Sequence, residues 1–143
     1  MLIFTTEAWK QMWNLVYSFD REVGWYMMLD EDGKEFNKVL LYPQTSTYTT
    51  FTTNDLEMMN WFDSFPDDEF KRIRCHGHSH VNMDVWPSSK DLEFEESIVK
   101  QLKPDDRYVF LICNKLGEMR VAIYTNNEKT EHYYNLRKDV AYI

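Results

Sequence analysis

The segment His78-Ser79-His80, with Ser88 and Asp91 following it, constrains the local fold of this chain more than any other feature. Two histidines separated by one residue in an extended segment point to the same side, about 6–7 Å apart along the chain. Ser88 and Asp91 are spaced so that they would lie on one face of the first turn of a helix. The spacing therefore predicts a strand that ends at the histidines, then a loop, then a helix that begins at Ser88.

The same side chains form a set of metal ligands. Two imidazole nitrogens, one carboxylate and an open fourth position are typical of a catalytic zinc site, because structural zinc sites are closed by four protein ligands. We therefore predict that His78, His80 and Asp91 bind Zn²⁺. Cys75 and Cys113 lie in apolar, strand-like contexts without C-x-x-C spacing, and we expect them to be buried free thiols.

A structural interpretation of Ser88 and Asp91 is also open. The segment from Pro87 to Asp91 comes just before Leu92 and a run with apolar periodicity, so Ser88 could be a helix N-cap and Asp91 its acidic capping-box partner. An isolated His-x-His on a strand is often structural too. The two interpretations are compatible, since Ser88 can open the helix and still face the metal.

The pattern H-S-H-x7-S-x-x-D resembles the JAMM motif of the JAB1/MPN+ metalloproteases, whose best-known members cleave ubiquitin isopeptide bonds. The resemblance implies an α/β fold with a mixed central sheet flanked by helices, in a single domain over residues 1–143. It also implies a zinc-dependent hydrolase that cuts a peptide or isopeptide bond, with Ser88 stabilising the oxyanion. The family's general base is an upstream glutamate. Glu22 fits it, because Glu22-Val23-Gly24-Trp25 opens an apolar run after an amphipathic helix.

The sequence departs from the family pattern in one place. Many relatives carry a proline directly after the second motif histidine, where this chain has Val81. The ligands themselves are kept, unlike in MPN-minus relatives, which serve as scaffolds. His76 would share a strand face with His78 and His80, and we expect it to pack or to hydrogen-bond near the site rather than to bind the metal.

The resemblance further implies a substrate with a flexible, extended tail, such as the Gly-Gly terminus of a ubiquitin-like protein. The compact chain leaves little room for the insertions with which eukaryotic members grip ubiquitin, so it resembles prokaryotic or viral members. The alternatives are a peptidase of the same type with an unrelated peptide substrate, and a non-catalytic binding module that retains metal. A zinc deaminase would need P-C-x-x-C, which this sequence lacks.

Composition limits the domain count, the kinds of partner and the location of the protein. The 143 residues, 43% of them hydrophobic, are enough for one well-packed core, and a net charge of −8 disfavours binding to nucleic acid. The N-terminus has no basic region or long apolar core, and no segment is long enough to cross a membrane, so we predict a cytoplasmic protein with no membrane partner. Oligomeric state is left open.

Periodicity and turn residues place the elements. A helical stripe of Trp9, Met12, Trp13, Val16 and Phe19 predicts a core-facing helix, capped by Thr6 and ending near Phe19. Asn54 is expected to cap a second helix, and the third runs from about Ser88 to Leu102. The predicted strands are residues 22–29, 36–42, 46–53, 71–80, 107–113, 119–125 and 130–136.

Overall fold

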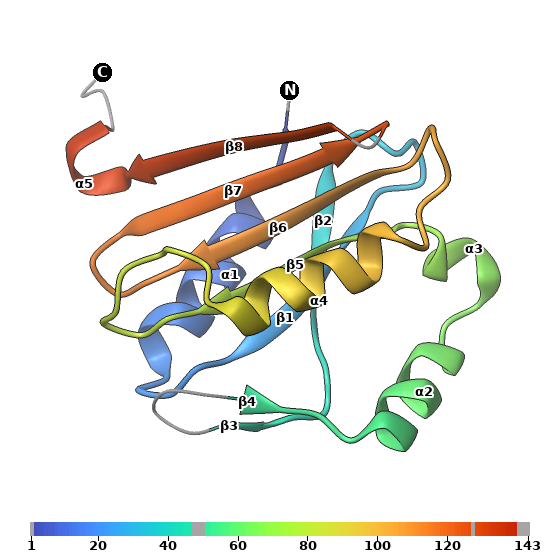
Figure 1. The fold of residues 1–143 in the computed structure, drawn as a ribbon, viewed down its shortest axis with the longest axis horizontal. Helices are drawn as coiled ribbons and strands as arrows, with labels where there is room; N and C mark the ends of the chain where they lie inside the picture. Colours follow the sequence, from blue (N-terminus) through green and yellow to red (C-terminus); the bar gives the residue numbers. More distant parts are fainter. Residues whose placement is uncertain (1, 47–50, 127, 140–143) are drawn as a thin grey trace.

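A six-stranded mixed sheet forms the centre of the computed structural model, which describes residues 2–46, 51–126 and 128–139 (Figure 1). Only β5 and β6 run parallel, and all other neighbouring strands of this sheet are antiparallel. A second, two-stranded sheet pairs β3 (Thr45–Ser46) with β4 (Phe51–Thr52). In spatial order the large sheet consists of β2 (Phe36–Leu41), β1 (Gly24–Leu29), β5 (Ile73–Ser79), β6 (Arg107–Cys113), β7 (Glu118–Thr125) and β8 (Glu128–Asn135).

Helices cover both faces of the large sheet. Figure 1 shows α1 (Thr6–Ser18) behind the sheet and α4 (Ser89–Val99) in front of it. On the same side as α4, α2 (Asp55–Asp63) packs near β1, and two short helices, α3 (Asp67–Phe70) and α5 (Leu136–Asp139), complete the fold. The prediction of an α/β fold with a mixed central sheet flanked by helices is confirmed.

Successive side chains along each strand point to opposite faces of the sheet, one toward α1 and the other toward α2 and α4. Trp25 and Met27 of β1 belong to the core under α1, whereas Tyr26 and Met28 pack toward α2. The central strand β6 behaves in the same way, with Val109 and Leu111 on the α1 side and Tyr108 and Phe110 on the α4 side. Strands buried on both faces read as continuous apolar runs, which is what both segments show.

Element ends differ in small ways from the predicted ones. The N-cap of α1 is Thr5, whose hydroxyl accepts the Ala8 N–H at 3.2 Å. Because α1 ends at Ser18, Phe19 is its C-cap and is 43% exposed, so its predicted place in the core is wrong. The α4 helix ends at Val99, since the next residues form tight turns, with the Leu102 N–H donating to the Val99 carbonyl.

The strand predictions hold with shifted bounds. The strand expected at 130–136 already begins at Glu128, and the one expected at 71–80 ends at Ser79. The β structure expected at 46–53 is not one strand, because Ser46 of β3 pairs antiparallel with Phe51 of β4; residues 47–50 lie outside the described residues. Cys75 and Cys113 are buried and free, as predicted. No helix in the described ranges has the length and apolar character needed to cross a membrane.

Gly77 is required by the packing beneath the motif. A Cβ atom on Gly77 would lie 2.5 Å from the indole ring of Trp25, which sits opposite it on β1. Because that ring is fully buried, it has no room to give way. The glycine between His76 and His78 therefore lets the two strands close, with Trp25 on one face of the sheet and the histidines on the other.

Candidate metal centre

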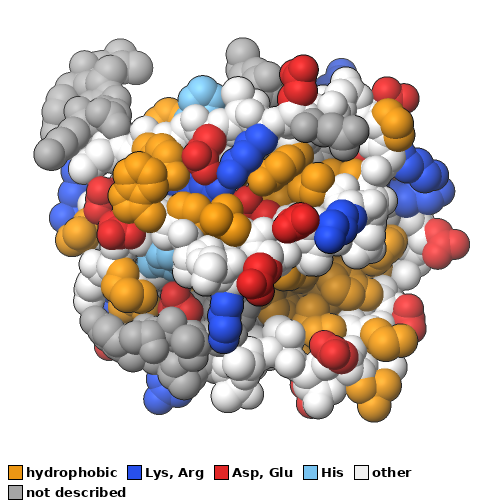
Figure 2. Space-filling view, viewed as in Figure 1, with side chains coloured by type: hydrophobic (Ala, Val, Ile, Leu, Met, Phe, Trp, Pro, Cys, Tyr) orange, Lys and Arg blue, Asp and Glu red, His pale blue; other side chains and the backbone are white. Residues whose placement is uncertain are grey.

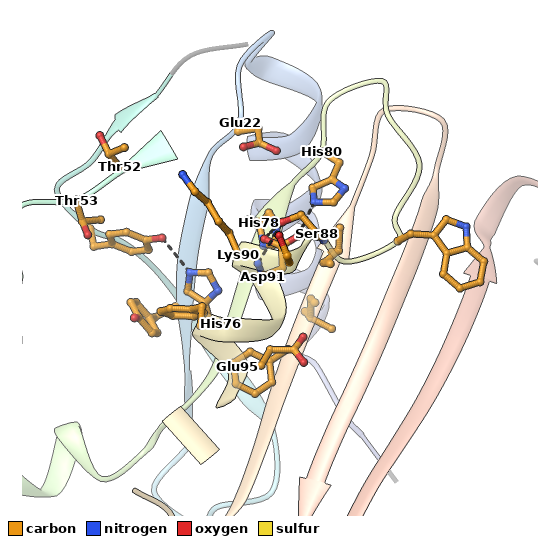
Figure 3. A pocket seen from close by; sticks show the side chains of 18 of the residues that line it. Glu22, Thr52, Thr53, His76, His78, His80, Ser88, Lys90, Asp91 and Glu95 are labelled. Atoms are coloured by element: carbon orange, nitrogen blue, oxygen red, sulfur yellow. Dashed lines mark hydrogen bonds and ion pairs between the residues drawn. The ribbon is translucent and has the colours of Figure 1, made fainter. Parts of the chain in front are cut away.

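The end of β5 and the start of α4 bring three of the predicted residues together. His78 and His80 point to the same side, with ring centroids 4.9 Å apart, and both are 6% exposed. Asp91 lies in the first turn of α4 and faces them (Figure 3). His78 Nε2 is 3.1 Å from Asp91 Oδ1, and His80 Nε2 is 3.1 Å from Asp91 Oδ2. These side chains form a group that could bind a metal ion, with one ligand atom from each within 4.8 Å of the others.

The donor set fits zinc. His80 Nδ1 is 2.7 Å from the carbonyl oxygen of Asp84, so Nδ1 carries a hydrogen and Nε2 is the atom that faces Asp91. A neutral imidazole nitrogen and a carboxylate oxygen at this distance repel each other unless a cation joins them, either a proton or a metal. Zinc bonds of about 2.0–2.1 Å in a tetrahedron separate the ligand atoms by about 3.3 Å. The observed separations are close to that value.

The ionisation of the group agrees with a cation at this position. Burial alone would lower the pKa of His80, but hydrogen bonds to Asp91 and to the Asp84 carbonyl outweigh burial and raise it. Burial would raise the pKa of Asp91, yet hydrogen bonds from His78 and His80 hold it well below its usual range. The Asp91 carboxylate is thus ionised, which would favour a cation bound next to it.

Ser88 caps α4 and also faces the site. Its hydroxyl oxygen accepts the Asp91 N–H at 3.1 Å, while Asp91 Oδ2 accepts the Ser88 N–H at 2.8 Å, which completes a capping box. The structural interpretation of this pair is therefore correct. It leaves the hydroxyl hydrogen of Ser88 available, because the oxygen acts only as an acceptor in the box. Ser88 lines the same cavity as His78, His80 and Asp91.

Glu22 reaches the site through strand register. Gly24 pairs with His78, and the Val23 carbonyl accepts the Ser79 N–H at 2.9 Å, so the antiparallel register continues and sets Glu22 opposite His80. Residues directly opposite in such a pair share a face of the sheet. Figure 3 shows the Glu22 carboxyl above the His78–Asp91 group. It is only 7% exposed, and burial raises its pKa to about 7, with His80 opposing the rise and Asp91 adding to it.

His76 lies next to the three candidate ligands but outside their group. A hydrogen bond of 2.9 Å joins its Nε2 to the Tyr42 hydroxyl, and its ring is 6.0 Å from that of His78. Full burial lowers its pKa well below the ordinary value, so the ring is neutral. The geometry agrees with the expected packing and hydrogen-bonding position.

The backbone conformation of Val81 explains why this position does not carry the proline found in many members of the family that the motif resembles. This β-branched residue has φ 59°, in the left-handed region, and is buried directly after His80. Proline is locked near a φ of about −65° and cannot adopt this conformation. The Val81 carbonyl accepts the Lys115 N–H at 2.7 Å, which holds the turn. The turn brings the Asp84 carbonyl back to His80.

Sequence patterns missed a buried ion pair beside the site. Arg120 of β7 is fully buried, and its guanidinium pairs with the Glu95 carboxylate of α4, which is 3% exposed. The Tyr124 hydroxyl donates to Glu95 at 3.0 Å, and Arg120 Nε donates to Glu131 at 2.7 Å. No spacing rule connects Glu95 to a residue on β7. The signal available was only that Glu95 follows Asp91 by one helical turn.

One cavity of about 1140 Å³ contains the whole group. Glu22, Ser88 and the three candidate ligands line one part of it, and aromatic side chains from β1, β6, α2 and α4 line another. Figure 2 shows hydrophobic side chains on the floor of a hollow between α4 and α2. A substrate at the candidate metal centre would therefore meet both polar and aromatic surfaces.

Comparison with known proteins shows the fold alone. The sequence matches no family model and no curated protein. The structure is similar to the solution structure of protein DSY2949 from Desulfitobacterium hafniense, with a TM-score of 0.56 and 17% sequence identity. The match covers 92% of this chain and 90% of that protein.

Proposed function

We propose that this protein is a zinc-dependent hydrolase that cuts a peptide or isopeptide bond, in the manner of the JAMM metalloproteases that its motif resembles. The observation that carries the proposal is the meeting of His78, His80 and Asp91 with the buried Glu22 in one cavity. His78 and His80 would hold the zinc through Nε2, and Asp91 through its carboxylate. Bound there, zinc supplies Lewis-acid activation of water and of the scissile carbonyl.

The remaining residues have complementary roles in the proposal. Glu22 accepts a proton from the attacking water and passes it to the departing amine as the C–N bond breaks. In the metal-free protein burial raises its pKa to about 7, and a general base works best with a pKa near the working pH. Ser88 donates its hydroxyl hydrogen to the carbonyl oxygen as that oxygen becomes negative. The Asp84 carbonyl fixes the orientation of the His80 ring.

The substrate proposed for this site is an amide whose acyl part is a flexible tail, such as the Gly-Gly terminus of a ubiquitin-like protein. The candidate ligands lie where a strand end and a helix start converge, so a substrate backbone has to come close to both. Glycines permit such an approach because they carry no side chain. A peptide unrelated to ubiquitin-like proteins is the other candidate within the same chemistry.

Zinc content and hydrolysis together test the proposal. We expect about one zinc per chain by elemental analysis after chelation and reloading, and a His78→Ala/His80→Ala variant should lose it. Glu22→Gln should keep the zinc but lose about 10²–10⁴-fold of the hydrolysis of ubiquitin and ubiquitin-like fusions. Glu31→Gln, at the exposed tip of the β1–β2 hairpin, is the control and should behave like the wild type.

Three outcomes would count against it. Equal zinc in the double histidine variant would remove the metal assignment. A wild-type rate in Glu22→Gln would require another base. Zinc binding without cleavage of any fusion or linear peptide would favour the metal-retaining binding module.

A further inference from the structure

The cavity continues from the candidate metal centre into an aromatic arm. We use this name for the part lined by Tyr26, Tyr42, Met58, Phe62, His76 and Phe94. Two strands of the sheet form its floor, and α2 and α4 form its walls, so it is bounded by regular structure on several sides. The hollow between α4 and α2 in Figure 2 is its opening.

The ring of His76 lies between the aromatic arm and the candidate ligands. The His76 ring separates the two regions, since its centroid is 6.0 Å from that of His78 and 4.6 Å from that of Phe94. Tyr26 also packs against His76, with the ring centroids 4.9 Å apart. Each residue of an extended chain spans about 3.3 Å. A side chain one or two residues from a bond held at His78 can therefore reach the arm.

The surface of the arm is uncharged. Its lining is mostly aromatic and apolar, and burial raises the pKa of Tyr26 and of Tyr42, so both hydroxyls are neutral near pH 7. Apart from Glu22 and Asp91, the described charged residues that line the cavity are the exposed Asp55, Asp84 and Lys90 and the buried Glu95. The Glu95 carboxylate is already paired with Arg120. A charged group in the arm would lose its hydration without gaining an opposite charge there.

We propose that the aromatic arm is a substrate subsite that takes a bulky apolar side chain, aromatic or branched aliphatic, one or two residues from the bond that is cut. Its position relative to that bond rests on the proposed hydrolase function, whereas binding of the side chain does not. The subsite would make this protein selective for an amide with a large apolar neighbour, in addition to any preference for a glycine tail.

Peptide binding tests the proposal separately from hydrolysis. The probes are hexapeptides of glycine and serine in which one position at a time is replaced by Phe, Leu, Glu or Lys. Calorimetry with full-length, zinc-loaded Glu22→Gln measures binding without turnover. Burying one Phe or Leu side chain is expected to tighten binding by about 10–100-fold relative to the unsubstituted peptide. Glu and Lys should give no gain.

Two matched pairs of variants locate the bound side chain. Met58→Ala and Phe94→Ala should each reduce the preference for Phe severalfold. Their controls are Met59→Ala, next to Met58 on α2 and 62% exposed, and Leu92→Ala, on α4 and 44% exposed. Neither control residue lines the cavity, and both variants should keep the preference. Circular dichroism would verify that all four remain folded.

The outcomes separate the two proposals. A preference for Phe in binding, lost in Met58→Ala and Phe94→Ala but without cleavage by the wild type, supports the subsite and counts against the hydrolase. Cleavage with equal kcat/KM for Phe-containing and unsubstituted peptides overturns the subsite and leaves the hydrolase standing. A preference that survives both arm variants also overturns the subsite, because the side chain is then bound elsewhere.

Discussion

Glu22 is a carboxyl group held out of water opposite an imidazole, and its ionisation is coupled to folding. Its pKa is about 7 in the folded protein, because burial penalises the charged form, against an ordinary value of 4.5. Between these values the folded state binds more protons than the unfolded chain does. The free energy of unfolding of metal-free protein therefore falls as the pH rises from about 4.5 to 7, and the loss is complete above that window.

Replacing Glu22 by glutamine should remove this pH dependence. Metal-free Glu22→Gln is expected to match the wild type near pH 4 and to be more stable by about 1–3 kcal/mol at pH 8. Urea unfolding of chelator-treated proteins at several pH values measures the difference. Glu31→Gln, at the exposed hairpin tip, is the control and should follow the wild type throughout. Parallel stability curves for Glu22→Gln and the wild type would show that the buried carboxyl is not coupled to folding.

Single residues differ in how far the sequence predicts them. His78, His80 and Asp91 meet as expected, because strand and helix periodicity determine their directions. The left-handed Val81 had no such signal, since the sign of φ there depends on how the loop closes against Lys115. The Asp84 carbonyl was equally hidden, because every residue has the same main-chain oxygen.

At the scale of elements, α4 is tied to the sheet by charge as well as by apolar packing. Glu95 lies one turn after Asp91 on the same helix, and its carboxylate pairs with the buried Arg120 of β7. Apolar contacts hold the helix too: Phe94 packs against His76 and Phe110. Ile98 and Val99 pack against the cluster that contains Tyr108. The ion pair adds a charged contact between α4 and the sheet, one turn after Asp91.

Glu95→Gln should loosen the contact between α4 and the sheet near Asp91. Removing one charge of a buried pair costs about 3–5 kcal/mol when the other charge is left without a partner. Arg120 keeps its ion pair with Glu131, so the loss here should be smaller. We expect a lower free energy of unfolding in urea and weaker zinc binding in calorimetric titration. Glu96→Gln is the matched control. Its side chain is 69% exposed and pairs with Lys100 at 3.5 Å, so its effect should be close to zero. Unchanged zinc affinity in Glu95→Gln would show that the ion pair does not position Asp91.

The sequence predicts the starts of the helices better than their ends. The capping residues Asn54 and Ser88 mark the starts of α2 and α4 because each provides a side-chain acceptor for a backbone N–H. The ends were less predictable, as α4 closes in tight turns that carry no distinct residue type. The register that sets Glu22 opposite His80 involves strands far apart in sequence, so only the motif resemblance pointed to it.

At the scale of the whole molecule, the candidate centre exists only in the folded chain. Glu22 approaches from the start of β1, the histidines from the end of β5 and Asp91 from α4. A metal that binds this arrangement binds the folded state and not the unfolded one. Zinc should therefore stabilise the protein, and it must displace the proton that the raised pKa of His80 favours.

Thermal unfolding should show this linkage. At a zinc concentration of about 100 times Kd the stabilisation is about 2.7 kcal/mol, which corresponds to a rise in Tm of about 5–10 °C. The rise should be smaller at pH 5.5 than at pH 7.5, because protonated His80 competes with the metal. Scanning calorimetry with and without zinc measures both effects. His132→Ala, an exposed histidine of β8, should respond like the wild type, and His78→Ala/His80→Ala should not respond. An equal rise in the double variant would place the stabilising zinc elsewhere.

The capping box of α4 has a kinetic consequence. Asp91 Oδ2 faces His80 and also accepts the Ser88 N–H, so the carboxylate cannot swing away from a bound ion without breaking the first turn of the helix. Release of a metal from this candidate centre would then require the first turn of α4 to open. Metal exchange and the opening of that helix end would occur together.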